Sequence, residues 1–489
     1  MAAQVSISPH DLQPYCQRIQ STPEELDAAI VKSAAAQKEW AALTLEERIA
    51  IMEKFIEEFI NLSARIPNEL CKMMGRPISQ GAGEVRGFLE RAKYLVSIAA
   101  SSLADVGLQN TDKPGFRRFI KRVPHGVVLV IAPWNFPYLT SINSVLPALL
   151  AGNTVLFKPS PQTPLMGERL SLAFHRAGVP KDAIITLNLS TEGVTQAIQH
   201  PLVNFVSFTG SVPGGREVEK AAVNAPGFKG VALELGGKDP AYVRSDADLD
   251  YTAAELVDGA FFNSGQSCCA VERIYVHEAV YDEFVAKFVE IVKAYKLGDP
   301  YRTDTTLGPV ISLASANRIR KQVTDAVEAG AKTLIDPYPY RRVAKPDTAF
   351  VVPQVLVDVN HTMDVMKEET FGPVVGIQKV ASDEEAVQLM NDSPYGLTAS
   401  IWTNAEANPA SEEAFLALEA QLECGTVFLN RCDYLDPALA WTGVKDSGRG
   451  ISLSKFGFDQ LTRAKSVHMK IKTSVDPPAE EAKTEAPPS

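Results

Sequence analysis

Residues 127–158 read VVLVIAPWNFPYLTSINSVLPALLAGNTVLFK, and this stretch decides the fold. The apolar run Val127–Ile131 stops at Pro133, as expected for a strand that is buried on both faces. A helical segment follows, and NTVLFKPS then begins a second apolar strand. The alternation continues with AIITLNL (183–189) and NFVSFTG (204–210), each followed by a helical pattern. Apolar strands that alternate with helices predict an α/β fold on a parallel, doubly wound sheet.

A second set of strand–helix units begins after residue 236. Its apolar strands are PAYV (240–243), RIYV (273–276), TLID (333–336) and VVGIQKV (374–380), with amphipathic helices between them. The chain has 489 residues, which is too many for one hydrophobic core. We therefore expect two doubly wound, Rossmann-like lobes. Upstream, apolar positions at three- and four-residue spacing predict helix over residues 22–60.

Composition and charge limit the classes of partner. The formal net charge of -11 argues against a nucleic-acid or anionic membrane surface. No apolar run is long enough to span a bilayer, and the N-terminus lacks the features of a secretory signal, so we expect a cytoplasmic protein. The six cysteines form no CxxC pair and no metal-ligand spacing with histidines, so we predict neither disulfides nor a metal site. Residues 474–489 are rich in Pro, Glu and Ala and predict a disordered tail.

Four segments contain residues suited to chemistry, and each also has a plainer interpretation. Asn135 follows a strand end, where open α/β sheets bind ligands, but it could simply stabilise a turn. Residues 208–215 join a strand to a helix start that could seat a pyrophosphate, or they form an ordinary tight turn. Glu234 could be a desolvated general base, or it could pair with Lys238 at the surface. Cys268 could be an activated nucleophile or a small buried apolar residue.

In their order and spacing, WNFP, FTGS, LELGGK and FFNSGQ-x-C resemble the aldehyde dehydrogenase superfamily. KPS at 158–160, KEETFGP at 367–373 and GRG at 448–450 also match. The interval from Glu234 to Cys268 (268 − 234 = 34 residues) matches as well, which disfavours the plainer interpretations of both residues. The resemblance runs from the first helix to Lys472 and implies a cofactor-binding domain (1–111 and 126–235) and a catalytic domain (236–445).

The resemblance also implies roles for individual residues. Cys268 would attack the aldehyde carbon, and the Asn135 amide with the Cys268 backbone N–H would hold the oxyanion. Glu234 would activate water to hydrolyse the resulting thioester, while Cys269 would be a packing neighbour. Relatives that transfer the acyl group to coenzyme A typically lack this glutamate, so hydrolysis is favoured. A catalytically retired, crystallin-like structural protein is the alternative from another class.

The expected cofactor is NAD or NADP. By resemblance its contacts are Trp134, Lys158, Ser160, Gly210, Ser211, Glu369 and Phe371. After the KPS motif, many NAD-preferring relatives carry a glutamate that binds the adenosine ribose and repels a 2′-phosphate. This chain has Pro161 there, while Lys158 and Ser160 remain as phosphate partners. We therefore expect NADP to be accepted and even preferred.

The substrate is a small-molecule aldehyde, and Phe136 and Arg431 are assigned to its side of the site. The helix after WNFP offers polar Thr140, Ser141 and Asn143. Arg431 lies in the loop that corresponds to the family's substrate-anchor loop and could bind a substrate carboxylate with two hydrogen bonds. It could equally be a surface arginine paired with Asp433 or Asp436. The first interpretation predicts an acid semialdehyde such as succinic semialdehyde, and the second leaves a general aliphatic or aromatic aldehyde.

The resemblance further implies a homodimer or homotetramer. In the family a β-hairpin and a C-terminal strand build subunit contacts, and residues 112–125 and 460–473 are the matching segments. Exposed strands of this kind aggregate unless they are paired.

Overall fold

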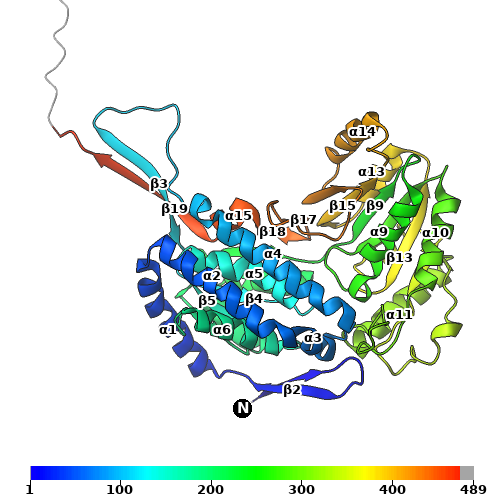
Figure 1. The fold of residues 1–489 in the computed structure, drawn as a ribbon, viewed down its shortest axis with the longest axis horizontal. Helices are drawn as coiled ribbons and strands as arrows, with labels where there is room; N and C mark the ends of the chain where they lie inside the picture. Colours follow the sequence, from blue (N-terminus) through cyan, green and yellow to red (C-terminus); the bar gives the residue numbers. More distant parts are fainter. Residues whose placement is uncertain (1, 474–489) are drawn as a thin grey trace, which may run out of the picture.

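The computed structural model describes residues 2–473, which form two α/β lobes side by side (Figure 1). The first lobe has a six-stranded sheet in the order β18-β8-β7-β4-β5-β6, and the second a seven-stranded sheet in the order β11-β12-β13-β10-β9-β15-β16. All neighbouring strands are parallel except β18 and β11, which pair antiparallel at the edges. The two predicted doubly wound sheets are therefore confirmed.

The strands of the first sheet are β4 (Val127–Ile131), β5 (Thr154–Lys158), β6 (Ile184–Thr186), β7 (Val203–Thr209), β8 (Gly230–Glu234) and β18 (Gly448–Arg449). Those of the second are β9 (Asp239–Val243), β10 (Val271–His277), β11 (Lys332–Thr333), β12 (Gln354–Val357), β13 (Val374–Val380), β15 (Thr398–Trp402) and β16 (Thr426–Leu429). The short pair β14 (Tyr395–Gly396) and β17 (Val444–Lys445) stands apart from both sheets. Of the expected strand TLID, only Thr333 is in a strand.

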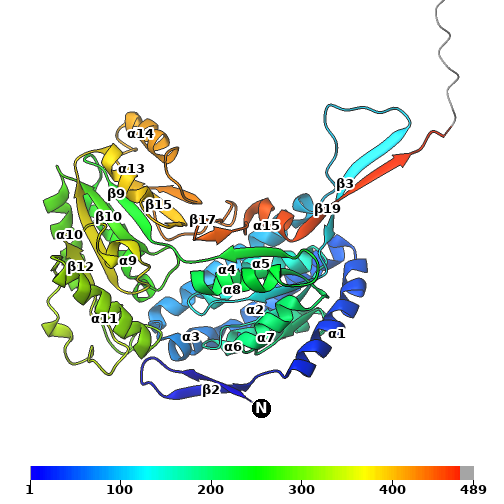
Figure 2. The ribbon, with the colours of Figure 1, turned by 180° about the vertical axis from the view of Figure 1, so that it is seen from behind.

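The helices of the first lobe are α1 (Pro23–Ala42), α2 (Leu45–Leu62), α3 (Ile66–Met74), α4 (Ile78–Ser102), α5 (Pro137–Leu150), α6 (Pro164–Ala177), α7 (Thr191–Gln199), α8 (Val212–Val223) and α15 (Ser454–Gln460). Those of the second are α9 (Leu249–Phe261), α10 (Tyr281–Lys293), α11 (Leu313–Glu328), α12 (Asp364–Lys367), α13 (Asp383–Asn391) and α14 (Pro409–Glu419). Seen from behind, α7 and α8 lie against the sheet of the first lobe (Figure 2). Among the described residues, none of these helices has the length and apolarity needed to cross a bilayer.

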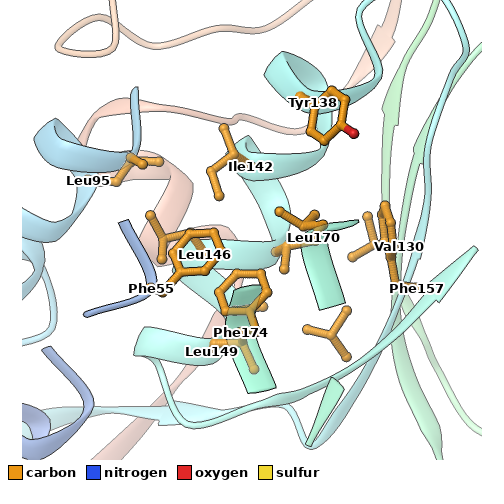
Figure 3. Packing of buried hydrophobic residues seen from close by; sticks show 14 of the residues in the cluster. Phe55, Leu95, Val130, Tyr138, Ile142, Leu146, Leu149, Phe157, Leu170 and Phe174 are labelled. Atoms are coloured by element: carbon orange, nitrogen blue, oxygen red, sulfur yellow. The ribbon is translucent and has the colours of Figure 1, made fainter. Parts of the chain in front are cut away.

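Both faces of the first sheet are buried, which explains why β4 is apolar throughout. Val128 and Val130 face a core with α2, α4, α5 and α6, whereas Val127, Leu129 and Ile131 face a core with α1, α7 and α8. In the first of these cores, the rings of Phe55 and Phe174 stack with centroids 3.7 Å apart (Figure 3). Apolar residues of α5 belong to the same core as Val128 and Val130. The core therefore holds α5, and the WNFP loop that precedes it, against the sheet.

The helix predicted over residues 22–60 is two helices. The predicted start is confirmed, because Thr22 caps α1 in a reciprocal capping box with Glu25. A second capping box, between Thr44 and Glu47, begins α2 and breaks the segment. The apolar spacing continues across the break, so periodicity alone did not reveal it. The hairpin of β1 (Ala3–Ile7) and β2 (Pro14–Ile19) was not predicted either.

A two-stranded ribbon projects from the body of the first lobe (Figures 1 and 2). It consists of β3 (Phe116–Pro124) and β19 (Thr462–Lys470), paired antiparallel over their full length. These strands lie within the segments 112–125 and 460–473 that the sequence assigned to subunit contacts. The predicted disordered tail, 474–489, lies outside the described residues.

Candidate active site

Two cavities, of about 380 and 560 Å³, meet between the lobes. Four residues line both of them: Thr140, Thr209, Glu234 and Cys268. Glu234 ends β8 of the first sheet, whereas Cys268 precedes β10 of the second. We call the smaller one, bounded by α4 and α5, the substrate cavity, and the larger one, bounded by the ends of β4, β5 and β7, the cofactor cavity. Two residues 34 apart in sequence therefore reach the same junction from different lobes (268 − 234 = 34).

A left-handed turn presents Cys268. After α9 ends, Asn263, Ser264 and Gly265 have φ values of 51°, 56° and 69°. Gly265 is required there, because a Cβ at this position would overlap the carbonyl group of Gly372. Consecutive left-handed residues are costly for side chains other than glycine, and such strain is concentrated at functional sites. The turn leaves Cys268 half-buried at the cavity junction.

The neighbouring Cys269 has a different environment. It is 2% exposed, and its Sγ donates to Asp433 Oδ1 at 3.0 Å. Hydrogen bonding with Cys268 and burial raise the pKa of the Cys269 thiol well above its usual value, which keeps it protonated. Of the two cysteines, Cys268 alone reaches the cofactor cavity. The geometry thus supports Cys268 as the nucleophile and Cys269 as its buried neighbour.

Asn135 lies against the backbone just before Cys268. Its Nδ2 donates to Gln266 O at 3.3 Å, and its carbonyl accepts a hydrogen bond from Arg76. Arg76 also donates Nε to Asn263 Oδ1 at 3.2 Å and forms a buried ion pair with Glu84 at 2.5 Å. Arg76 therefore joins the loop that carries Asn135 to the turn that presents Cys268. Sequence analysis missed this arginine, because no local pattern marks a contact between residues 59 and 187 positions apart.

Glu84 contributes a second contact to the same arrangement. Its Oε1 accepts hydrogen bonds from the backbone N–H groups of Tyr138 at 2.9 Å and Leu139 at 3.2 Å. A carboxylate suits the positive end of a helix, here the first turn of α5. The Arg76–Glu84 pair therefore holds the WNFP loop from both sides.

Glu234 is buried at the cavity junction and forms no surface ion pair with Lys238. Burial raises the pKa of its carboxyl group, while the charge of Arg91 and a hydrogen bond from Thr209 oppose that shift. Thr209 Oγ1 donates to Glu234 Oε2 at 3.5 Å. Lys238 is buried and pairs with Glu272 at 2.5 Å. The alternative in which Glu234 pairs with Lys238 is therefore wrong.

The residues expected to contact the cofactor come together in the cofactor cavity. Its lining includes Trp134, Lys158, Ser160, Pro161, Gly210, Ser211, Glu369 and Phe371. Trp134 and Phe371 meet edge to face, with ring centroids 5.5 Å apart. Burial raises the pKa of Glu369 to about 8, and the Gly237 N–H donates to its Oε1 at 3.1 Å. A Cβ at Gly236 would overlap this carboxylate, so the glycine pair lets Glu369 lie against the backbone.

The environment of Lys158 bears on whether this cavity fits a dinucleotide. It is 9% exposed, and burial lowers its pKa to about 8. Among the described residues it takes part in no ion pair, so a buried cation lines the cavity without a countercharge. Pro161 brings no carboxylate to the same loop. A phosphorylated, hydroxyl-rich ligand fits these donors, and the residues present are consistent with a nicotinamide dinucleotide.

The substrate cavity combines aromatic and charged walls. Phe136 and Phe262 have nearly parallel rings, 9° apart in plane with centroids 6.3 Å apart. The lining also contains Thr140, Asn143, Asp433, Tyr434, Trp441 and the arginines Arg76, Arg86 and Arg91. Ser141 instead donates to the Pro137 carbonyl inside α5.

Arg431 is exposed and is not part of the substrate-cavity lining. Its guanidinium lies over the Tyr434 ring, 3.6 Å from the centroid. Within the described part of the chain, Arg431 forms no ion pair with Asp433 or Asp436. Its role as a carboxylate anchor stays a prediction, and the structure places a different arginine, Arg91, in the cavity wall.

Two doubly wound lobes, with a thiol and a carboxylate where a dinucleotide cavity meets a substrate cavity, define a two-lobed nicotinamide-dependent oxidoreductase. A model of the aldehyde dehydrogenase family matches residues 2–467, and the chain belongs to this family. It is an NAD(P)-dependent enzyme that oxidises an aldehyde to the carboxylic acid.

Individual relatives are similar over nearly their whole length. Vanillin dehydrogenase of Corynebacterium glutamicum is 34% identical, over 95% of this chain and 94% of the relative. The NADP-dependent succinate-semialdehyde dehydrogenase of Mycobacterium avium is 34% identical, over 91% and 92%. Among solved structures, the NADP-dependent glyceraldehyde-3-phosphate dehydrogenase of Bacillus halodurans in complex with NADP is 31% identical, with a TM-score of 0.89 and 96% of each chain covered.

Proposed function

We propose that the enzyme works through a thioester on Cys268, which water activated by Glu234 then hydrolyses. The observation that carries this proposal is that both side chains line both cavities. A nucleophile at the junction can meet the aldehyde on one side and the nicotinamide on the other. A base at the same junction can reach water beside the thioester.

In the first half-reaction the Cys268 thiolate adds to the aldehyde carbon. Asn135 Nδ2 uses one hydrogen on Gln266 O, which leaves the second for the developing oxyanion together with the Cys268 backbone N–H. When bound, the cofactor supplies the hydride acceptor, so that loss of hydride from the adduct leaves a thioester.

In the second half-reaction Glu234 takes a proton from water as the water attacks the thioester carbon. The C–S bond then breaks and Cys268 leaves as the thiolate. Overall, aldehyde, water and oxidised cofactor give carboxylic acid, reduced cofactor and one proton. The position of Glu234 at the junction supports hydrolysis over transfer to coenzyme A.

A turnover experiment tests this scheme. The wild-type enzyme should oxidise butanal continuously. The absorbance of reduced cofactor, measured at about 340 nm, should show many equivalents formed per subunit. Cys268→Ser should abolish reduction of the cofactor. Turnover of no aldehyde by the wild-type protein would favour the retired, structural alternative.

We propose that NADP is the preferred cofactor. Lys158 and Ser160 line the cofactor cavity as partners for a 2′-phosphate, and Pro161 brings no repelling carboxylate. Several relatives are named as NADP-dependent, which supports the proposal.

We propose an acid semialdehyde as the substrate class. The succinate-semialdehyde dehydrogenases among the relatives support it, as do the arginines in the substrate cavity. The efficiency for succinic semialdehyde relative to butanal tests it, and a ratio well above ten is expected. The vanillin-oxidising relative and the two parallel phenylalanine rings favour an aromatic aldehyde as the second candidate, which would give a ratio near one.

We also propose that the ribbon of β3 and β19 joins subunits into a homodimer or homotetramer. A two-stranded ribbon is only marginally stable alone in water, so its projection from the body is consistent with a partner surface. Light scattering should give the mass of two or four chains, and the mass of one chain would contradict the proposal.

A further inference from the structure

The wall of the substrate cavity contains hydrogen-bond donors that lack acceptors. Arg91 on α4 is 7% exposed, and Asn143 on α5 is 1% exposed. Arg91 Nη1 donates to the Leu139 carbonyl at 2.8 Å and to Asn143 Oδ1 at 3.3 Å. The Asn143 side-chain oxygen therefore already accepts a hydrogen bond from Arg91. The Nδ2 of the same amide is buried and has no hydrogen-bond partner.

Within residues 2–473, Arg91 also lacks a direct ion-pair partner. Among the described residues, no carboxylate lies within ion-pair distance of its guanidinium, whereas Arg76 in the same wall pairs with Glu84. The two recorded acceptors of Arg91 are neutral and both use Nη1. A buried guanidinium that no carboxylate contacts directly is costly, and an unmet amide donor adds to that cost. An anionic oxygen ligand in the cavity would satisfy both groups.

Arg91 lies near the reacting groups. It lines the same cavity as Cys268 and Glu234, and its charge acts on Glu234. A ligand held by Arg91 through one end can therefore present its other end to Cys268.

Resting on the proposed thioester chemistry, we propose that Arg91 and Asn143 form a subsite for a carboxylate at the far end of the aldehyde substrate. The free Nε and Nη2 edge of a guanidinium matches the two oxygens of a carboxylate, and the Asn143 amide supplies a third donor. Arg91 is thus the specificity-determining residue for an acid semialdehyde.

Most of the acidic groups around this subsite do not oppose an anion strongly. Glu84 is neutralised by Arg76, and Glu90 is exposed and accepts a hydrogen bond from Tyr434 at 2.8 Å. Burial raises the pKa of Asp433 to about 7, so its carboxyl group is partly protonated near neutral pH, and burial also raises the pKa of Asp258. Of the other arginines in the lining, Arg76 is paired with Glu84, and Arg86 adds positive charge.

The test compares kcat/KM for succinic semialdehyde and butanal in the wild type and in Arg91→Gln, Arg91→Lys and Asn143→Leu, with saturating NADP. Arg91→Gln should lower the ratio of the two efficiencies at least tenfold, mainly through KM for the semialdehyde. Arg91→Lys should retain part of the ratio, because lysine keeps the positive charge but lacks the paired N–H donors of the guanidinium. One arginine control should leave the ratio within twofold: Arg431→Gln, which lies outside the cavity lining.

The outcomes separate this inference from the proposed function. If Arg91 only tied α4 to α5, its removal would lower both efficiencies equally, which would overturn the subsite. Loss of the ratio in Arg431→Gln instead would also overturn it and would restore the anchor predicted from sequence. A wild type that oxidises butanal without preferring the semialdehyde would refute the subsite alone. A wild type that oxidises neither would refute the thioester chemistry.

A second measurement does not depend on a folded variant. In the wild type, succinate should inhibit butanal oxidation at least tenfold more strongly than butyrate, because only succinate has a second carboxylate to reach Arg91. Equal inhibition by the two acids would overturn the proposal.

Discussion

Glu234 and Cys268 belong to different lobes, yet both side chains line both cavities of the active site. The glycine pair after Glu234 helps to make this possible. A Cβ at Gly237 would crowd the Cys268 carbonyl, and one at Gly236 would overlap the Glu369 carboxylate. The strand end that carries Glu234 therefore packs closely against the turn that carries Cys268 and against the Glu369 carboxylate. A larger side chain in place of either glycine would separate the groups that the proposed chemistry brings to one carbon atom.

The Glu234→Gln variant should acylate but not deacylate. Glutamine keeps the size of the side chain and cannot take a proton from water, so one equivalent of reduced cofactor per site should form in a burst. The steady-state rate should then fall by about 10²–10⁴-fold. Stopped-flow absorbance measures the burst, and mass spectrometry should find the acyl group on Cys268. A burst-free variant with near-normal turnover would exclude Glu234 as the base.

The pH dependence should report the environment of Glu234. The base works only when ionised, and burial raises its pKa, so deacylation should fall as the pH drops through that raised value. The positive charge of Arg91 opposes the shift. Arg91→Gln should therefore move the acidic limb of kcat for butanal to higher pH, and Arg91→Lys should leave it in place. A limb that does not move in Arg91→Gln would contradict the coupling.

Pro161 should set the cofactor preference. The wild type should use NADP at least as efficiently as NAD, and Pro161→Glu should lower kcat/KM for NADP at least tenfold, which corresponds to about 1.4 kcal/mol. The physical reason is repulsion between a carboxylate and the 2′-phosphate. Pro161→Gln is the matched uncharged control and should change the ratio of the two cofactors little. A wild-type efficiency tenfold higher with NAD would refute the preference.

The Glu84→Gln variant should be less stable and less active. It leaves Arg76 as an uncompensated buried cation, which costs about 3–5 kcal/mol when one partner of a buried pair is removed. Because Arg76 also donates to the Asn135 carbonyl, kcat should fall for every aldehyde tested. Urea unfolding measures the stability. Glu90→Gln, an exposed change on the same helix, should cost less than about 1 kcal/mol, and equal losses in the two variants would argue against the pair.

The sequence by itself determined the two doubly wound sheets and predicted the residues of the proposed chemistry. Strands such as Val127–Ile131 are apolar at every position, which records burial on both faces whatever packs there. Asn135, Glu234 and Cys268 are each recognisable within a short motif. Local patterns of this kind need no knowledge of distant partners.

Only the tertiary structure decided which of these residues meet and what surrounds them. Arg76 reaches partners 8, 59 and 187 residues away, and Lys238 pairs with Glu272 rather than with the nearby Glu234. Arg431 is the anchor that the sequence predicts, yet it is exposed and lies over the Tyr434 ring, whereas Arg91, which no sequence motif singles out, is buried in the cavity wall. Periodicity shows which face of a helix is buried, but only the packing of the two lobes determines what that face contacts. That packing therefore decides that Arg91 is buried in the substrate cavity without an ion-pair partner among the described residues.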